Sequence, residues 1–171
     1  MKFKTFFIGL VGFFILPSCE QEPPALPAET QKGLGTFGCL INGELVIQES
    51  QRWLWSPDKR EACGTQDTAG RFTLVANLEF GHTFRLFVSQ PQLGQNVIDS
   101  VFFWMNSGHY YVARNVQQVY FTRFDNNIAS GTFAFDANCY DRHTHELIPN
   151  KKIQVRKGRF DVRIGPCWHW H

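Results

Sequence analysis

Apolar and polar residues alternate along much of this chain from position 36 onward. The clearest case is Arg159–Ile164, where an apolar set, Phe160, Val162 and Ile164, alternates with a charged set, Arg159, Asp161 and Arg163. The same period of two runs through Arg71–Leu78, Thr83–Val88 and Thr132–Asp136. Such alternation predicts β-strands with one buried face and one face in water, and it places Asp161 in a ladder of surface charges.

Shorter apolar runs extend this pattern over the rest of the chain. They predict further strands at Phe37–Ile41, Glu44–Ile47, Val97–Trp104, His109–Ala113, Val119–Phe124 and Lys152–Arg156. Asn42 and Gly43 lie between the first two of these and form a strong hairpin signal, because both residues tolerate positive φ. Lys157 and Gly158 predict a similar turn before the last strand.

The fold class follows from these strands. No stretch of twelve or more residues has helical spacing. About 8–10 short strands separated by Gly, Asn and Pro predict an all-β fold, an antiparallel β-sandwich or barrel, of which we favour the sandwich. Hydrophobic residues make up 43% of the chain, and its 17 Phe against 2 Met indicate an interior built from rigid rings. A chain of 171 residues fits one domain.

The first eighteen residues have the pattern of an export signal. Lys2 and Lys4 precede Phe6–Leu16, an unbroken run of eleven apolar residues. A helix needs about 20 apolar residues to cross a bilayer, so this run predicts a signal-peptide core and not a permanent anchor. The next residues, Leu16-Pro17-Ser18-Cys19, resemble the lipobox of bacterial lipoproteins.

That resemblance implies that residues 1–18 are removed and that the Cys19 thiol receives diacylglycerol, with a further acyl chain such as palmitate on the new amino group. Several chains hold a protein stably in a membrane, whereas one chain binds only marginally. The Pro- and Gly-rich residues 19–35 predict a flexible tether, and residues 36–171 a single β domain. Glu20 and Glu22 resemble the surface-export signal of Bacteroidota lipoproteins, or belong to a solvated linker. We therefore expect an outer-membrane lipoprotein that faces the periplasm or the cell surface.

Three further segments, spread over most of the mature chain, resemble an uncharacterised lipoprotein family of Bacteroidota, a domain of unknown function. The segments are Thr36-Phe37-Gly38-Cys39-Leu40-Ile41-Asn42-Gly43, Ile128-Ala129-Ser130-Gly131-Thr132-Phe133-Ala134-Phe135 and Lys157-Gly158-Arg159-Phe160-Asp161-Val162. The resemblance implies a β-rich domain behind a lipobox. It brings no catalytic residue with it.

Beside Cys19 the chain has an even number of cysteines: Cys39, Cys63, Cys139 and Cys167. An exported protein meets an oxidising compartment, so we expect at least one disulfide among them, with three connectivities open. Cys39 lies in a predicted strand and is alternatively a small buried hydrophobe.

Two constellations could bind a ligand. In Cys139-Tyr-Asp141-Arg-His143-Thr-His145, an extended chain would place thiol, carboxylate and imidazoles on one side, where His143 and His145 could hold zinc; a polar loop is the alternative. The pairs Trp53/Trp55 and Trp168/Trp170 could each share a strand face and stack on sugar rings, or could fill the core.

Charge and motifs limit the remaining function classes. Without Lys2 and Lys4 the chain has 15 Lys+Arg against 15 Asp+Glu, so its neutral surface argues against nucleic-acid binding. None of the common nucleophile, zinc-protease, phosphate or dinucleotide motifs occurs, and we expect neither catalysis nor a cofactor. The leading hypothesis is a lipoprotein held in the membrane through acyl chains on Cys19, with a non-catalytic β domain in an envelope role. The alternatives are a glycan or small-ligand module and a metal-binding protein.

Overall fold

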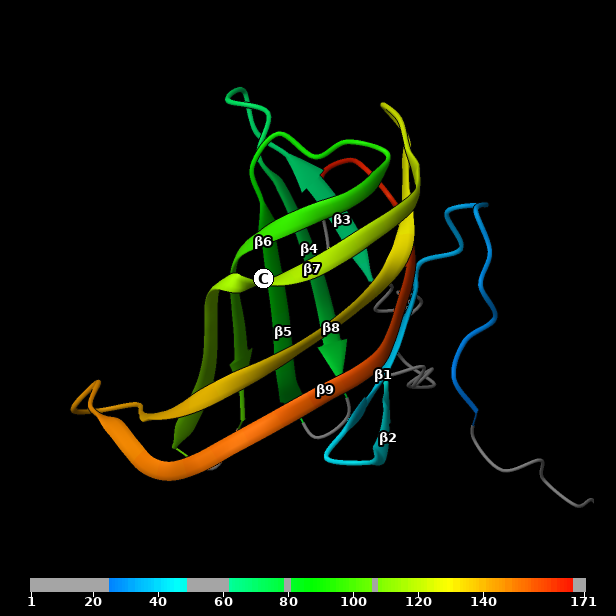
Figure 1. Ribbon diagram of the computed structural model, residues 1–171. Helices are drawn as coiled ribbons and strands as arrows, with labels where there is room; N and C mark the ends of the chain where they lie inside the picture. Colours follow the sequence, from blue (N-terminus) through cyan, green and yellow to red (C-terminus); the bar gives the residue numbers. More distant parts are fainter. Residues whose placement is uncertain (1–24, 49–61, 79–80, 106–107, 168–171) are drawn as a thin grey trace, which may run out of the picture.

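The computed structural model describes residues 25–48, 62–78, 81–105 and 108–167, with the backbone alone for 114–117. Within these ranges nine antiparallel strands form one sheet in the order β2-β1-β9-β8-β7-β6-β5-β4-β3 (Figure 1). They are β1 (Thr36–Ile41), β2 (Glu44–Ile47), β3 (Cys63–Gln66), β4 (Phe72–Leu78), β5 (His82–Val88), β6 (Gly94–Trp104), β7 (His109–Phe124), β8 (Ile128–Asp141) and β9 (Leu147–Arg163). The all-β prediction is confirmed. Within the described residues no helix is long and apolar enough to span a membrane.

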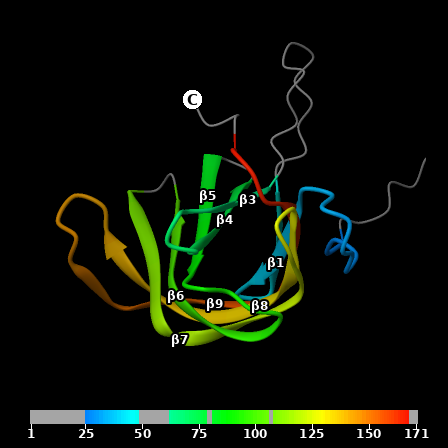
Figure 2. The same ribbon diagram turned by 90° about the horizontal axis from the view of Figure 1, so that it is seen from above.

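The two ends of this sheet meet, so the fold is the barrel alternative of the predicted class. Gly64 in β3 forms a parallel bridge with Ile164 just beyond β9, and the Gly165 N–H donates to the Gly64 carbonyl at 2.9 Å. A second bridge joins Gln48, after β2, to Leu78 at the end of β4. Seen from above, β6–β9 form one wall of the barrel and β3–β5 the opposite wall (Figure 2).

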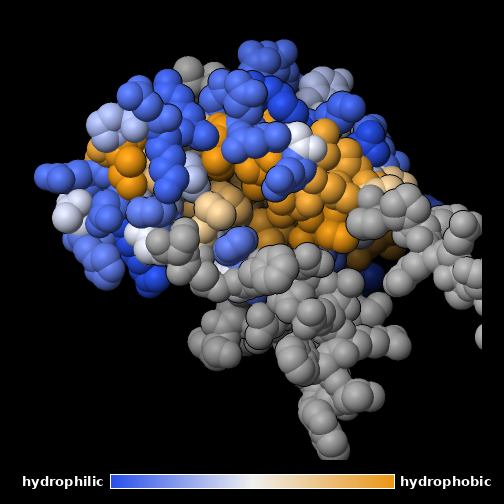
Figure 3. Space-filling model, turned by 90° about the horizontal axis from the view of Figure 1, so that it is seen from below, coloured by the Kyte–Doolittle hydropathy of each residue, from blue (hydrophilic) through white to orange (hydrophobic). Residues whose placement is uncertain are grey.

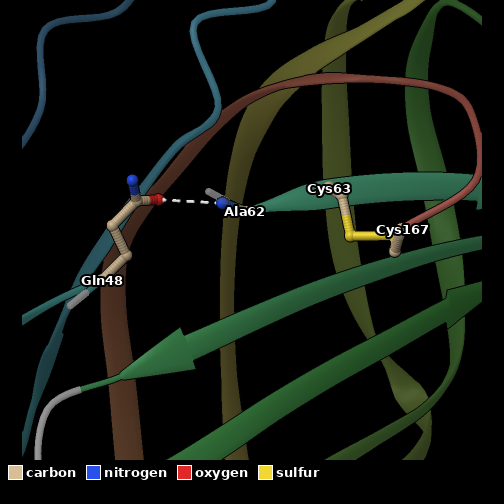
Figure 4. Close-up of a disulfide and its surroundings, with 4 residues drawn as sticks. All are labelled: Gln48, Ala62, Cys63 and Cys167. Carbon is tan, nitrogen blue, oxygen red and sulfur yellow. Dashed lines mark hydrogen bonds between the residues drawn. A yellow bond between two sulfur atoms is a disulfide. The ribbon is translucent and has the colours of Figure 1, made fainter. Parts of the chain in front are cut away.

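A disulfide crosslinks the region where the two ends of the sheet meet. Cys63 in β3 is bonded to Cys167 in the segment after β9, with Cα atoms 6.0 Å apart (Figure 4). Directly before β3, the Ala62 N–H donates to the Gln48 side chain at 3.3 Å (Figure 4). A crosslink over 104 residues stabilises a fold by roughly 4–5 kcal/mol, because it restricts the unfolded chain.

The interior is packed with aromatic rings, as the excess of Phe predicts. Phe37 lies 4.7 Å from Phe84, and Phe84 lies 5.4 Å from Phe133, measured between ring centroids. All three are at most 4% exposed. Viewed from below, apolar side chains gather in the middle of the face, with polar side chains above them and to their left (Figure 3), so the apolar interior reaches this end of the barrel.

Two strands each join two of the predicted strands and are therefore much longer than the sequence indicates. β7 joins the two predicted strands at His109–Ala113 and Val119–Phe124. β9 likewise runs through Lys157 and Gly158, where the predicted turn is wrong. Arg156 and Lys157 instead form a β-bulge, after which Gly158 pairs with Phe133: Lys157 has the positive φ of 52° that a turn would also use, but the chain continues in the same direction.

The predicted hairpin at Asn42 and Gly43 is confirmed. Their φ angles are 52° and 90°, both positive, and Ile41 pairs directly with Glu44. Asn42 also exchanges hydrogen bonds of 2.9 Å with the backbone of Gln154 in β9, so the turn is fixed to the neighbouring strand.

Candidate functional site

A shallow groove of about 610 Å³ lies on the outer face of the wall formed by β6–β9, the face toward the reader in Figure 1. Its lining combines one exposed aromatic ring with amide, hydroxyl and charged groups. The residues are Glu29, Gln95, Gln118, Tyr120, Thr132, Phe133, Ala134, Lys157, Gly158 and Arg159. They come from four strands and from the segment that precedes β1.

The strand register places the polar side chains of the groove in rows. Gln95 in β6 pairs with Tyr120 in β7, Tyr120 with Thr132 in β8, and Thr132 with Arg159 in β9. Paired residues project to the same face, and neighbouring strands are about 4.8 Å apart, so the row is about 14 Å long. Tyr120 is 54% exposed, whereas Phe121 beside it is fully buried in the core.

Within the part of the chain that the structure describes, Tyr120 has no partner ring, unlike several other outward-facing aromatic residues. Phe102 and Trp104 stack on each other at 5.4 Å, and the Arg85 guanidinium lies 5.4 Å from the Trp104 ring. Tyr110 stacks on Tyr140 at 5.6 Å. No ring contact of this kind involves Tyr120 among the described side chains, and at 54% exposure much of this residue is accessible from solvent.

The bulge in β9 adds a cationic group to the groove. Phe133 pairs with Gly158 and Phe135 with Val155, which leaves Arg156 and Lys157 opposite the single residue Ala134. Arg156 is held by Asp136 at 2.6 Å and by the carbonyl groups of Phe135 and Val155. Lys157 is exposed and lines the groove.

One side of the groove is formed by the segment that precedes β1. Glu29 forms an ion pair with Arg159 at 3.2 Å, and the same guanidinium donates to the Pro27 carbonyl at 3.1 Å. Pro27 itself covers Gly38, where a Cβ atom would overlap its ring. The extended segment runs beside β1 in Figures 1 and 2.

A buried carboxylate holds the next part of this segment. Asp161 is 1% exposed and accepts hydrogen bonds from the Lys32, Gly33 and Leu34 N–H groups at 3.1, 2.8 and 3.3 Å. The hydroxyls of Thr30 and Ser130 also donate to it. Burial alone would raise the pKa of Asp161, but these hydrogen bonds outweigh it and lower the pKa to about 2.

Two expectations are corrected by this arrangement. Asp161 does face outward between Arg159 and Arg163, but it is not part of a surface charge ladder, because residues 30–34 cover it. The described end of the predicted tether, residues 25–35, is hydrogen-bonded to the barrel and is therefore not a free linker there. The alternation along the strand predicts to which face the Asp161 side chain projects, but it does not predict that residues 30–34 cover this side chain.

The predicted lipidation and tryptophan sites lie outside the described residues. They are Cys19, Trp53, Trp55, Trp168 and Trp170. They remain predictions.

The predicted metal ligands are separated in the structure. Cys139 is fully buried in the core, whereas His143 and His145 lie in the turn after β8. Asp141 accepts the His143 N–H at 2.8 Å and thereby shapes that turn, and the His145 Nδ1 atom lies 3.2 Å from the Tyr110 hydroxyl. Within the described ranges no three His, Cys, Asp or Glu side chains form a group suited to a metal ion.

Among the described residues, the two cysteines outside the disulfide lie in the core. Cys39 and Cys139 are both free and fully buried. Burial raises the pKa of the Cys39 thiol to about 12, so it carries no reactive thiolate near neutral pH. Cys39 thus has the alternative role expected for it, that of a small apolar side chain.

The groove is the feature that sequence reasoning missed. Its local signal was present, since Gln118 and Tyr120 alternate with the apolar Val119 and Phe121. Which residues of other strands lie beside Tyr120 depends on register over four strands, however, and no local pattern gives that. No protein-family model, curated protein or solved structure matches the chain.

Proposed function

We propose that this chain is a lipid-anchored, non-catalytic binding module of the outer membrane whose barrel holds a glycan in the groove around Tyr120. The observation that carries the proposal is the Tyr120 side chain, 54% exposed and set between Gln95, Gln118 and Thr132. The anchor would be the acylated Cys19 that the lipobox predicts.

The chemistry of this surface matches that of a sugar. The flat face of an aromatic ring packs against the C–H groups on one side of a pyranose. Amide side chains both donate and accept, and therefore suit the hydroxyl groups that surround the ring. An open groove about 14 Å long on the outside of the barrel accommodates a few units of a chain that continues beyond both ends.

The charged groups of the groove favour binding over hydrolysis. Cleavage of a glycosidic bond usually requires two carboxyl groups on opposite sides of the bond. Glu29 is the single carboxylate among the described lining residues, and it is paired with Arg159 at 3.2 Å. The groove is thus better suited to retain a glycan than to cut it.

The docked segment would hold the groove near the membrane. From Cys19 to Ala25, the first described residue, the chain has six residue steps and reaches about 20 Å at most. Residues 27–34 are then fixed to the barrel by Arg159, Arg123 and Asp161. A receptor built in this way would collect glycans close to its own membrane surface.

The test is glycan binding by the acylated mature protein in detergent micelles, first on an array and then by calorimetry with the strongest oligosaccharide. Tyr120→Ala should weaken binding at least about tenfold, because the stacking surface is lost. Tyr140→Ala removes a second outward-facing tyrosine, outside the groove, and should leave affinity unchanged. Absence of any glycan ligand, or equal affinity of the Tyr120→Ala protein, would contradict the proposal.

A further inference from the structure

A lysine is turned into the groove by an irregularity of its strand. In β9, Val155 and Gly158 are buried, so strict alternation would place one residue between them, and the strand has two. The extra residue opposite Ala134 lets both Arg156 and Lys157 project outward. Bulges commonly redirect side chains in this way next to binding sites.

The backbone of Lys157 is in a conformation that a lysine rarely adopts. Its φ is 52°, in the left-handed region that costs a residue with a Cβ atom roughly 1 kcal/mol. The hydrogen bonds of Arg156 to the carbonyl groups of Phe135 and Val155 hold the bulge from one side. On the other side Gly158 lies against the Phe133 ring, where a Cβ atom would overlap it.

The charge of Lys157 is not balanced within the groove. Glu29 is paired with Arg159 at 3.2 Å, and Asp136, next to the bulge, is paired with Arg156 at 2.6 Å. Neither carboxylate is therefore free for Lys157, and no ion pair of Lys157 occurs among the described residues. The groove thus carries one net positive charge, on a long side chain that can reach toward the Tyr120 row.

We infer that the glycan held in this groove is acidic, with a carboxylate on the sugar that binds Lys157 while a sugar ring stacks on Tyr120. Lys157 lies two strands away from Tyr120 and two residues further along the sheet, which separates their Cα atoms by about 12 Å. Because the lysine side chain can extend toward Tyr120, the distance from its ammonium group to the ring is then about the length of one or two sugar units. Uronic acids combine the required parts, a stacking ring face and a carboxylate. The inference rests on the proposed function and names its ligand class.

The experiment compares uronate oligosaccharides with their methyl esters, which keep the same sugar chain and lack the charge. Galacturonate, glucuronate and mannuronate oligomers are each titrated into the acylated mature protein. At least one acid should bind about tenfold more tightly than its ester, and added salt should reduce that difference. Lys157→Asn should remove the difference, because asparagine accepts the positive φ and brings no charge.

Lys152→Gln is the matched control, since it removes one exposed cation from the same strand outside the groove. It should leave the preference for the acid intact. If acid and ester bind equally, and both depend on Tyr120, the acidic ligand is refuted and the glycan function stands. If neither the acids nor the esters bind, and no glycan on the array binds either, both proposals are refuted. A loss of the acid preference in the Lys152→Gln protein as well would also overturn the role of Lys157.

Discussion

Asp161→Ala should lower the free energy of unfolding by about 3 kcal/mol and release the segment that precedes β1. The carboxylate is the common acceptor for three backbone N–H groups and two hydroxyls, and its removal leaves these donors without a partner. Urea denaturation measures the stability. Hydrogen exchange should show that the Lys32, Gly33 and Leu34 amides, protected in the wild type, exchange rapidly in the variant.

Asp136→Ala is the control for this substitution. Asp136 forms a close ion pair with Arg156, but both side chains are about half exposed, so its loss should cost less than about 1 kcal/mol. Amide protection at residues 32–34 should stay unchanged. If Asp161→Ala cost no more than this control, or left those amides protected, the docking role of Asp161 would be wrong.

The same carboxylate predicts the direction of an acid effect. Its pKa is near 2 in the folded protein and near 3.8 when unperturbed, so its contribution is complete above about pH 4 and disappears as the pH falls toward 2. The loss amounts to about 2 kcal/mol. In Asp161→Asn this part of the acid dependence should be missing, which denaturation curves between pH 5 and pH 2 would reveal (about one curve per half unit).

Gly131→Ala should destabilise the barrel by about 3–5 kcal/mol, or prevent folding. A Cβ atom at this position would collide with the backbone carbonyl oxygen of Tyr120, in the neighbouring strand β7, and would also approach the Phe160 ring. Backbone within a ladder cannot move aside as a flexible side chain can, so β7 and β8 would have to separate. Thermal unfolding followed by circular dichroism checks this expectation.

Gly165→Ala provides the comparison, because a Cβ atom there meets no other atom within 4 Å and the position has no positive φ. We expect a change of less than about 0.5 kcal/mol, with a sign that favours alanine. Equal stability of the two variants would mean that β7 and β8 are not packed as closely at Gly131 as described.

The faces of the strands could be predicted from the sequence, and their surroundings could not. Period-two alternation correctly placed Phe160 and Val162 on the core face of β9 and Asp161 on the opposite face, although Asp161 is buried there as well. The cover over Asp161 comes from residues 127 or more positions away, however, and a Pro- and Gly-rich stretch has no pattern that reveals such a contact. A carboxylate among arginines therefore had the appearance of a surface charge.

The bulge shows a second limit of local reasoning. Lys157-Gly158 indicated positive φ, which is correct for Lys157, but both a turn and a bulge use that backbone angle. At Asn42-Gly43 the predicted turn is correct, since the two short strands on either side of it pair with each other. At Lys157 the partner strand β8 continues past both residues, and only this long-range pairing decides in favour of a bulge.

The most direct test of the central claim is to map the bound glycan on the protein. Backbone amide signals of isotope-labelled protein are followed by NMR while the strongest oligosaccharide from the array is added. The account predicts shifts centred on Gln118, Tyr120 and Thr132, with Phe87 and Phe102 on the far part of the sheet unchanged. Shifts centred on any other surface or on the barrel interior, or no shifts at saturating oligosaccharide, would contradict it.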